Sequence, residues 1–108
     1  MNPDIFERLG ETFATRKEAD PATSYTARLF AKGPDAILKK IGEEAAELLL
    51  ASKNNDAHEV VHEASDLMFH VLMLLTWHGL SIDDIKRELE RREGISGIEE
   101  KASRKKPE

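Results

Sequence analysis

The sequence has no cysteine among its 108 residues, and this absence removes several kinds of chemistry. Without thiols the chain can form no disulfide framework, no thiolate zinc site and no cysteine nucleophile, so oxygen and imidazole are the metal ligands that remain. A chain without cysteine cannot be stabilised by disulfides in an oxidising compartment. We therefore expect a cytoplasmic protein.

Long hydrophobic runs and an excess of basic residues are missing as well. The longest apolar stretch, residues 67–77, falls short of the roughly 20 residues that a membrane helix needs, and the first residues do not resemble a signal peptide. The formal net charge is −5, so the chain lacks the basic face that binding to nucleic acid requires. We expect neither a membrane nor a nucleic acid as partner, although metal ions could still adapt the protein to an anionic substrate.

Glycine and proline are scarce, with six and four residues, and helix-forming residues dominate. The length suits one domain, which we expect to be all-α and to cover residues 1–93, followed by a loosely ordered tail at residues 94–108. Apolar periodicity and capping signals predict helices at residues 4–17, 25–32, 35–53, 56–78 and 81–92.

Acidic residues spaced i, i+3 occur five times, but 21 acids in this length give roughly four such pairs by chance. The spacing alone therefore does not identify a functional pair, and only the surroundings of a pair can do so. On a helical wheel of residues 35–53, Glu44 and Glu47 border the apolar face next to Lys40, while Glu43 lies further toward solvent. We expect Glu44 to be the most buried acid.

In the predicted helix 56–78, the residues Glu63, Asp66 and His70 form a narrow polar stripe, and nearly every other direction is apolar. This pattern predicts a buried helix whose stripe points into packed surroundings. Buried carboxylates are costly unless they are protonated, paired with bases or bound to cations.

Binding to cations is one interpretation of these acids. Four carboxylates on two packed antiparallel helices can converge on one spot, and such hard oxygen ligands favour Mg²⁺ or Mn²⁺. These ions can neutralise a polyphosphate and hold a water molecule for attack at phosphorus. The alternative is a structural network in which the acids pair with Lys39, Lys40 or Lys53. Spacing does not decide between the two.

Several other side chains are candidates with structural alternatives. His70 can contact a phosphate or a metal-binding carboxylate, or it can be a buried structural histidine. His58 and His62 stand at i, i+4, but no third zinc ligand is evident, which favours surface histidines. The apolar run at residues 67–77 exceeds what one helix of so small a domain needs and indicates a dimer.

Basic residues bracket the segment 24–26 and can grip phosphate, with Tyr25 stacking on a base. The alternative is that these residues are merely solvated charges. The basic residues are Arg16, Lys17, Arg28 and Lys32.

Five segments resemble one known family. They are Arg16-Lys17, Asp20-Pro21-x-Thr23-Ser24-Tyr25-Thr26-x-x-Leu29, Lys39-Lys40-Ile41-Gly42-Glu43-Glu44-Ala45-x-Glu47, Glu63-Ala64-x-Asp66-Leu67-x-x-His70 and Ser96-Gly97-Ile98-Glu99-Glu100-Lys101-Ala102-Ser103-Arg104. Together they resemble the phosphoribosyl-ATP pyrophosphohydrolases of histidine biosynthesis, members of the MazG-like all-α nucleotide pyrophosphohydrolases. The acidic pairs alone are typical of the superfamily, whereas the Ser-Tyr-Thr and Lys-Ile-Gly-Glu-Glu segments narrow the resemblance to this family.

The resemblance implies hydrolysis of 1-(5-phosphoribosyl)-ATP to 1-(5-phosphoribosyl)-AMP and pyrophosphate with Mg²⁺, or Mn²⁺ as a substitute. It also implies a homodimer or higher homo-oligomer with a four-helix core completed by dimerisation. The implied catalytic and metal-binding residues are Glu44, Glu47, Glu63 and Asp66, with Glu43 as a further metal contact. The implied substrate-binding residues are Arg16, Lys17, Ser24, Tyr25, Thr26, Lys40 and His70.

Two other functions fit the same residues. One is an enzyme that removes free or damaged nucleoside triphosphates with the same chemistry. The other is a non-catalytic helical dimerisation module in which the acids only form salt bridges. Metal-dependent stabilisation would separate this module from either enzyme.

Overall fold

The computed structural model describes residues 2–95 of the 108-residue chain. Within that range it has five helices and no strand, which confirms the prediction of an all-α fold. The helices are α1 (Ile5–Arg16), α2 (Tyr25–Lys32), α3 (Pro34–Lys53), α4 (Ala57–Trp77) and α5 (Ile82–Arg92). The predicted tail at residues 94–108 lies outside the described residues from residue 96 onward. The dimer stays a prediction.

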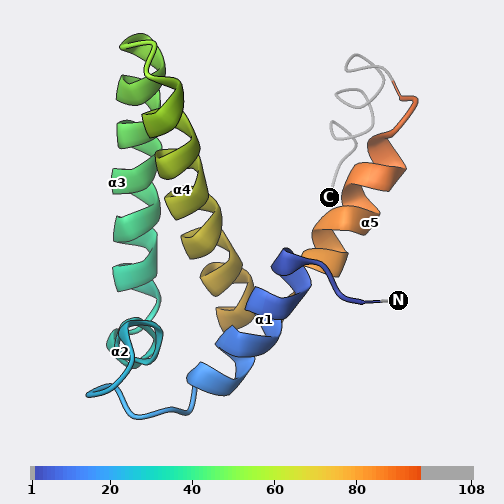
Figure 1. Cartoon of the computed structure of the whole chain (residues 1–108). Helices are drawn as coiled ribbons and strands as arrows, with labels where there is room; N and C mark the ends of the chain where they lie inside the picture. The colour runs from blue at the N-terminus through green and yellow to red at the C-terminus, as the bar shows by residue number, and fades with distance from the viewer. Residues whose placement is uncertain (1, 96–108) are drawn as a thin grey trace, which may run out of the picture.

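The helices α3 and α4 form an antiparallel hairpin, which is the largest feature of the fold (Figure 1). Pro34 occupies the first turn of α3, where its missing N–H costs nothing. The tight connection uses Asn55 with φ of 56°, a left-handed conformation that asparagine tolerates. Asp56 then caps α4 by accepting a hydrogen bond from the Glu59 amide at 3.1 Å. The hairpin therefore aligns the acidic segments of α3 and α4.

The helices α1 and α2 cover the end of the hairpin opposite this connection (Figure 1). Ser24 caps α2, and α2 packs on α3 while α1 packs on α4. The Phe13 ring meets the Phe69 ring edge-on, with centroids 5.0 Å apart. The buried core gathers at this end and consists of Phe13, Leu29, Phe30, Ile37, Leu72 and Met73.

A glycine follows the end of the helix α4. Gly79 has φ of 72°, and its amide donates to the Thr76 carbonyl at 3.0 Å. The Leu80 amide donates to the Leu75 carbonyl at 2.8 Å, which completes a Schellman motif. The chain then continues into α5.

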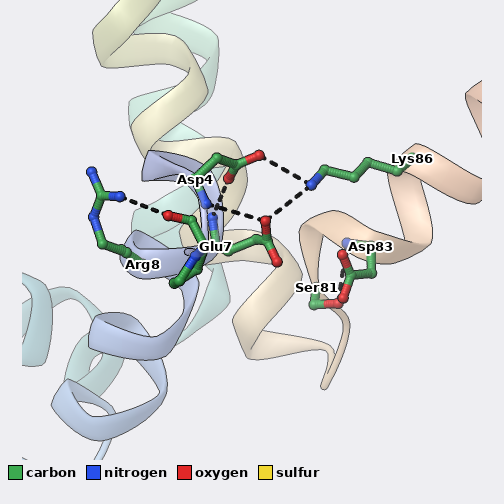
Figure 2. Close-up of polar contacts among 7 residues, drawn as sticks. Asp4, Glu7, Arg8, Ser81, Asp83 and Lys86 are labelled. Carbon is green, nitrogen blue, oxygen red and sulfur yellow. Dashed lines mark hydrogen bonds and ion pairs between the residues drawn. The ribbon is translucent and has the colours of Figure 1, made fainter. Parts of the chain in front are cut away.

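The helix α5 extends away from the hairpin, and none of its residues is buried (Figure 1). Ser81 and Asp84 form a capping box at its start. Its link to α1 is an ion-pair cluster in which the Lys86 ammonium lies 3.1 Å from Asp4 and 3.3 Å from Glu7 (Figure 2).

The exposure of α4 differs from the sequence prediction of a helix buried on most sides. Val61 is 67% exposed on α4, and Leu49 is 68% exposed on α3. The reason is that α1 packs near the later half of α4 and leaves the rest of the hairpin without a cover in the single chain. Among residues 2–95, no helix combines the length and apolarity needed to cross a membrane.

Candidate metal centre

Three carboxylates from α3 and α4 meet in the hairpin. Each of Glu44, Glu47 and Glu63 offers an oxygen atom that lies within 4.8 Å of the other two. Glu44 is 6% exposed and is the most buried acid in the described part of the chain, as predicted. Glu63 is half-buried and Glu47 is exposed. Three anions this close repel one another unless a proton or cation lies between them.

The buried oxygens of this cluster are not satisfied by the protein. Within residues 2–95, neither Oε2 of Glu44 nor Oε2 of Glu63 has a hydrogen-bond partner. The Lys40 ammonium is 3.6 Å from Oε1 of Glu44 and 3.8 Å from Oε1 of Glu43. The structural network considered from the sequence is therefore incomplete, because one lysine leaves Oε2 of Glu44 without a partner.

The electrostatic effect of the cluster is visible at Glu63. Its pKa is raised to about 7, first by hydrogen bonding with the Glu47 side chain, then by burial and by Glu44. A carboxyl group that keeps its proton near neutral pH relieves the repulsion between its neighbours. A divalent cation would relieve the same repulsion and displace that proton.

Asp66 belongs to a second group that shares Glu63 with the first. Ligand atoms of His62, Glu63 and Asp66 lie within 4.8 Å of one another. Nε2 of His62 is 3.4 Å from Oδ2 of Asp66, and both side chains are partly open to solvent. The structure thus connects Asp66 to the three-glutamate cluster through Glu63. The sequence interpretation overlooked His62 as a neighbour of Asp66, although their i, i+4 spacing signals it.

A pocket of about 360 Å³ adjoins the cluster between α2, α3 and α4. Lys40, Glu44 and Asp66 bring charge to its wall, and it is also lined by Tyr25, Phe69 and His70. A second pocket of about 220 Å³ is lined by Glu47 and Glu63 among others. The carboxylate cluster therefore borders both spaces. Phe69 is a lining residue that the sequence interpretation missed, since its spacing matches the apolar core.

Four predicted substrate-binding residues do not line this pocket: Arg16, Lys17, Ser24 and Thr26. Ser24 accepts a hydrogen bond from the Ala27 amide at 3.2 Å, and Thr26 is buried in α2. Arg16 and Lys17 are exposed at the end of α1, where the Lys17 ammonium lies 5.7 Å from the centre of the Trp77 ring. The structure brings Tyr25, Lys40 and His70 together with the acids, and it leaves Arg16 and Lys17 outside the pocket lining.

This arrangement suits the binding of a charged, aromatic ligand together with a cation. The acids offer only oxygen atoms, which favours a hard divalent cation. Lys40 offers positive charge to an anion, and Tyr25 offers an aromatic ring that is 47% exposed. The pocket therefore combines positive charge with an exposed aromatic ring.

Comparison with known proteins identifies the family of this chain. The family model described as phosphoribosyl-ATP pyrophosphohydrolase matches residues 6–93. Among relatives named phosphoribosyl-ATP pyrophosphatase, that of Dechloromonas aromatica (strain RCB) is 59% identical over 94% of this chain and 94% of its own length. That of Chromobacterium violaceum is 56% identical over 97% of both chains. That of Nitrosospira multiformis is 57% identical over 96% of this chain and 86% of its own length. The resemblance found in the sequence motifs is confirmed, and the chain belongs to the phosphoribosyl-ATP pyrophosphohydrolase family.

Proposed function

We propose that this protein hydrolyses 1-(5-phosphoribosyl)-ATP to 1-(5-phosphoribosyl)-AMP and pyrophosphate, the second step of histidine biosynthesis. The names of its relatives support the substrate. The observation that carries the proposal is the cluster of Glu44, Glu47 and Glu63. Two buried oxygens of this cluster lack hydrogen-bond partners within residues 2–95, and the cluster adjoins a pocket lined by Tyr25 and Lys40.

The carboxylates fit Mg²⁺, with Mn²⁺ as a substitute. Two buried oxygens without partners and a raised pKa at Glu63 are what a cation-binding site is expected to display without its ion. Glu44, Glu47 and Glu63 would hold the ion together with Asp66, and Glu43 would be a further contact. When bound, Mg²⁺ supplies the positive charge that neutralises the triphosphate.

In the reaction, the oxygen of one water molecule forms a bond to phosphorus while the bridging P–O bond between the α and β phosphoryl groups breaks. The protons of the water end on the phosphate products. No side-chain nucleophile takes part. The role of the protein is to fix the triphosphate in line with the water and to compensate its charge.

Around the pocket, Lys40 contacts the phosphates and Tyr25 stacks on a base of the substrate. Ser24 and Thr26 flank Tyr25 at the start of α2. Their proposed contacts with the substrate therefore come from the same segment as that of Tyr25. Arg16 and Lys17, at the end of α1, do not line the pocket, and their proposed contact with the phosphates rests on the family resemblance.

We also propose that the working form is a homodimer or a higher homo-oligomer, present in the cytoplasm. The support is the apolar surface on the hairpin, where Leu49, Leu50 and Val61 are all more than 60% exposed. A second copy that covers this surface would complete a four-helix core. Sedimentation analysis should give at least twice the mass of 12.2 kDa, and a monomer at micromolar concentration would contradict the dimer.

The enzymatic proposal is tested by measuring pyrophosphate release from phosphoribosyl-ATP with Mg²⁺ and after chelation by EDTA. We expect turnover with the metal and none without it. Absence of turnover at every Mg²⁺ concentration would contradict the proposal. A parallel panel of ATP, dUTP and dCTP serves as the control, because equal rates on all four would instead indicate an enzyme that removes free nucleoside triphosphates.

A further inference from the structure

Both ring nitrogens of His70 are already engaged by the protein. Nε2 lies 2.8 Å from the Tyr25 hydroxyl, and Nδ1 lies 2.8 Å from the backbone carbonyl of Asp66. The residue is only 5% exposed, and the Phe69 ring packs against its imidazole at 5.3 Å between centroids. A phosphate could reach His70 only by breaking one of these hydrogen bonds.

The chemistry of the partners fixes the direction of both bonds. A backbone carbonyl can only accept, so Nδ1 of His70 carries the proton that it donates to Asp66. In the neutral ring Nε2 is then an acceptor, and the Tyr25 hydroxyl is its donor. Burial raises the pKa of Tyr25, so its hydroxyl keeps the proton that this bond needs.

The two bonds connect separate parts of the pocket. Tyr25 is the first residue of α2, and His70 and Asp66 lie one turn apart on α4. The Tyr25 and His70 rings meet edge-on, with centroids 6.0 Å apart and an interplanar angle of 88°. This geometry fixes the hydroxyl end of Tyr25 while 47% of the residue stays exposed.

We propose that His70 is a positioning residue, which holds the Tyr25 ring at the pocket wall through its Nε2 and does not itself contact the substrate. The hydrogen bond to the Asp66 backbone sets the orientation of His70. The position of the Tyr25 ring relative to the carboxylates therefore depends on His70. The nature of the base rests on the proposed function, but the positioning of Tyr25 does not.

Two histidine variants separate the bonds that His70 makes. In His70→Asn the amide nitrogen can replace Nδ1 and still donate to Asp66, but nothing reaches Tyr25. In His70→Gln the longer amide places an oxygen near the position of Nε2, where it can accept from the Tyr25 hydroxyl. Tyr25→Phe keeps the ring and removes the donor. His58→Asn, at an exposed position in the first turn of α4, is the matched control.

Steady-state kinetics with phosphoribosyl-ATP and Mg²⁺ then form a double-mutant cycle. Loss of one net hydrogen bond predicts that Tyr25→Phe and His70→Asn each raise KM about five- to tenfold, with kcat changed by less than about twofold. The double variant should be no worse than either single variant, and His70→Gln should recover most of the loss. Effects that multiply in the double variant, or a fall in kcat at unchanged KM, would overturn the proposal.

A spectroscopic measurement tests the same bond without turnover. In protein labelled with ¹⁵N-histidine, the His70 resonances should report a protonated Nδ1 and an unprotonated, hydrogen-bonded Nε2. The Nε2 resonance should shift in Tyr25→Phe, while those of His58 should not. A protonated Nε2 in the unaltered protein would overturn the positioning role. If phosphoribosyl-ATP is not hydrolysed, the proposed function fails, and this spectrum still decides the role of His70.

Discussion

Acids with the same i, i+3 spacing behave in opposite ways in two regions of the molecule. At the start of α1, Asp4 accepts a hydrogen bond from the Glu7 amide at 2.9 Å, and both acids meet the Lys86 ammonium (Figure 2). In the hairpin, Glu63 faces Glu47 and Glu44, and its Oε2 has no partner within residues 2–95.

The pKa values of the acids change in opposite directions in the two regions. The Glu7 amide, followed by Lys86, lowers the pKa of Asp4, and the neighbouring Arg91 and Arg92 lower that of Glu88 to about 2. Glu47 raises the pKa of Glu63 to about 7. The comparison teaches that spacing does not distinguish an acid that the protein has already paired from one that requires a cation, whereas the environment does.

The strongest test of this comparison replaces one acid in each region by its amide. Glu63→Gln removes a proposed metal ligand, so we expect pyrophosphate release to fall at least about a hundredfold. Asp4→Asn alters an acid of the paired cluster and should leave the rate within about twofold. Circular dichroism should report unchanged helix content in both variants. Equal loss of activity in the two variants would remove the distinction between the regions.

Thermal unfolding with and without metal is the next test. Mg²⁺ at a hundredfold excess over its Kd should stabilise the protein by about 2 to 3 kcal/mol relative to EDTA. The effect should persist in Asp4→Asn and be greatly reduced in Glu63→Gln. If the melting temperature of the unaltered protein does not depend on Mg²⁺, the acids of the hairpin form a structural network only.

The pH dependence should have opposite signs in the two regions. The raised pKa of Glu63 contributes stability that is complete below its ordinary value of 4.5 and is lost as the pH rises through about 7. The lowered pKa of Glu88 contributes stability that is present above 4.5 and is lost as the pH falls toward about 2.

Melting curves in EDTA check the sign at Glu63. Between pH 5 and 8, Glu63→Gln should reduce the loss of stability that accompanies rising pH. Stabilisation by Mg²⁺ should be larger at pH 8 than at pH 5.5, because the ion must displace the Glu63 proton. A Mg²⁺ effect that is independent of pH would contradict the assignment of this proton.

The smallest effect is expected from the ion pairs between α1 and α5. Lys86 is exposed, with 42% of its side chain accessible, so water and salt screen its attraction to Asp4 and Glu7. Lys86→Met should lower the melting temperature slightly at low salt and should not change it at 1 M NaCl. The rate of catalysis should be unchanged. Lys40→Met, at the pocket, is the contrasting variant and should raise KM.

The helices could be predicted closely because their ends carry local signals. Ser24, Asp56 and Ser81 cap the helices that follow them, Pro34 starts α3, and Gly79 follows the end of α4. Each signal acts over a few residues and does not depend on the tertiary fold. The boundaries therefore agree with the expected ones to within one residue.

Contacts between distant residues could not be predicted in the same way. Tyr25 and His70 are separated by 45 positions, and no periodicity relates them. The sequence placed the acidic stripe of α4 in packed surroundings, but Asp66 keeps 41% of its side chain exposed. Burial along that stripe depends on where α1, α2 and α3 cover α4, which a helical wheel does not contain.

The central claim is that the hairpin acids, unlike those of α1 and α5, hold a divalent cation. Anomalous diffraction from crystals grown with Mn²⁺ tests it most directly, because it locates the ion itself. We predict an anomalous difference peak for Mn²⁺ among the carboxylates of Glu44, Glu47 and Glu63. We predict no such peak beside Asp4 and Glu7. Electron density with no ion among the three glutamates at saturating Mn²⁺ would contradict the claim.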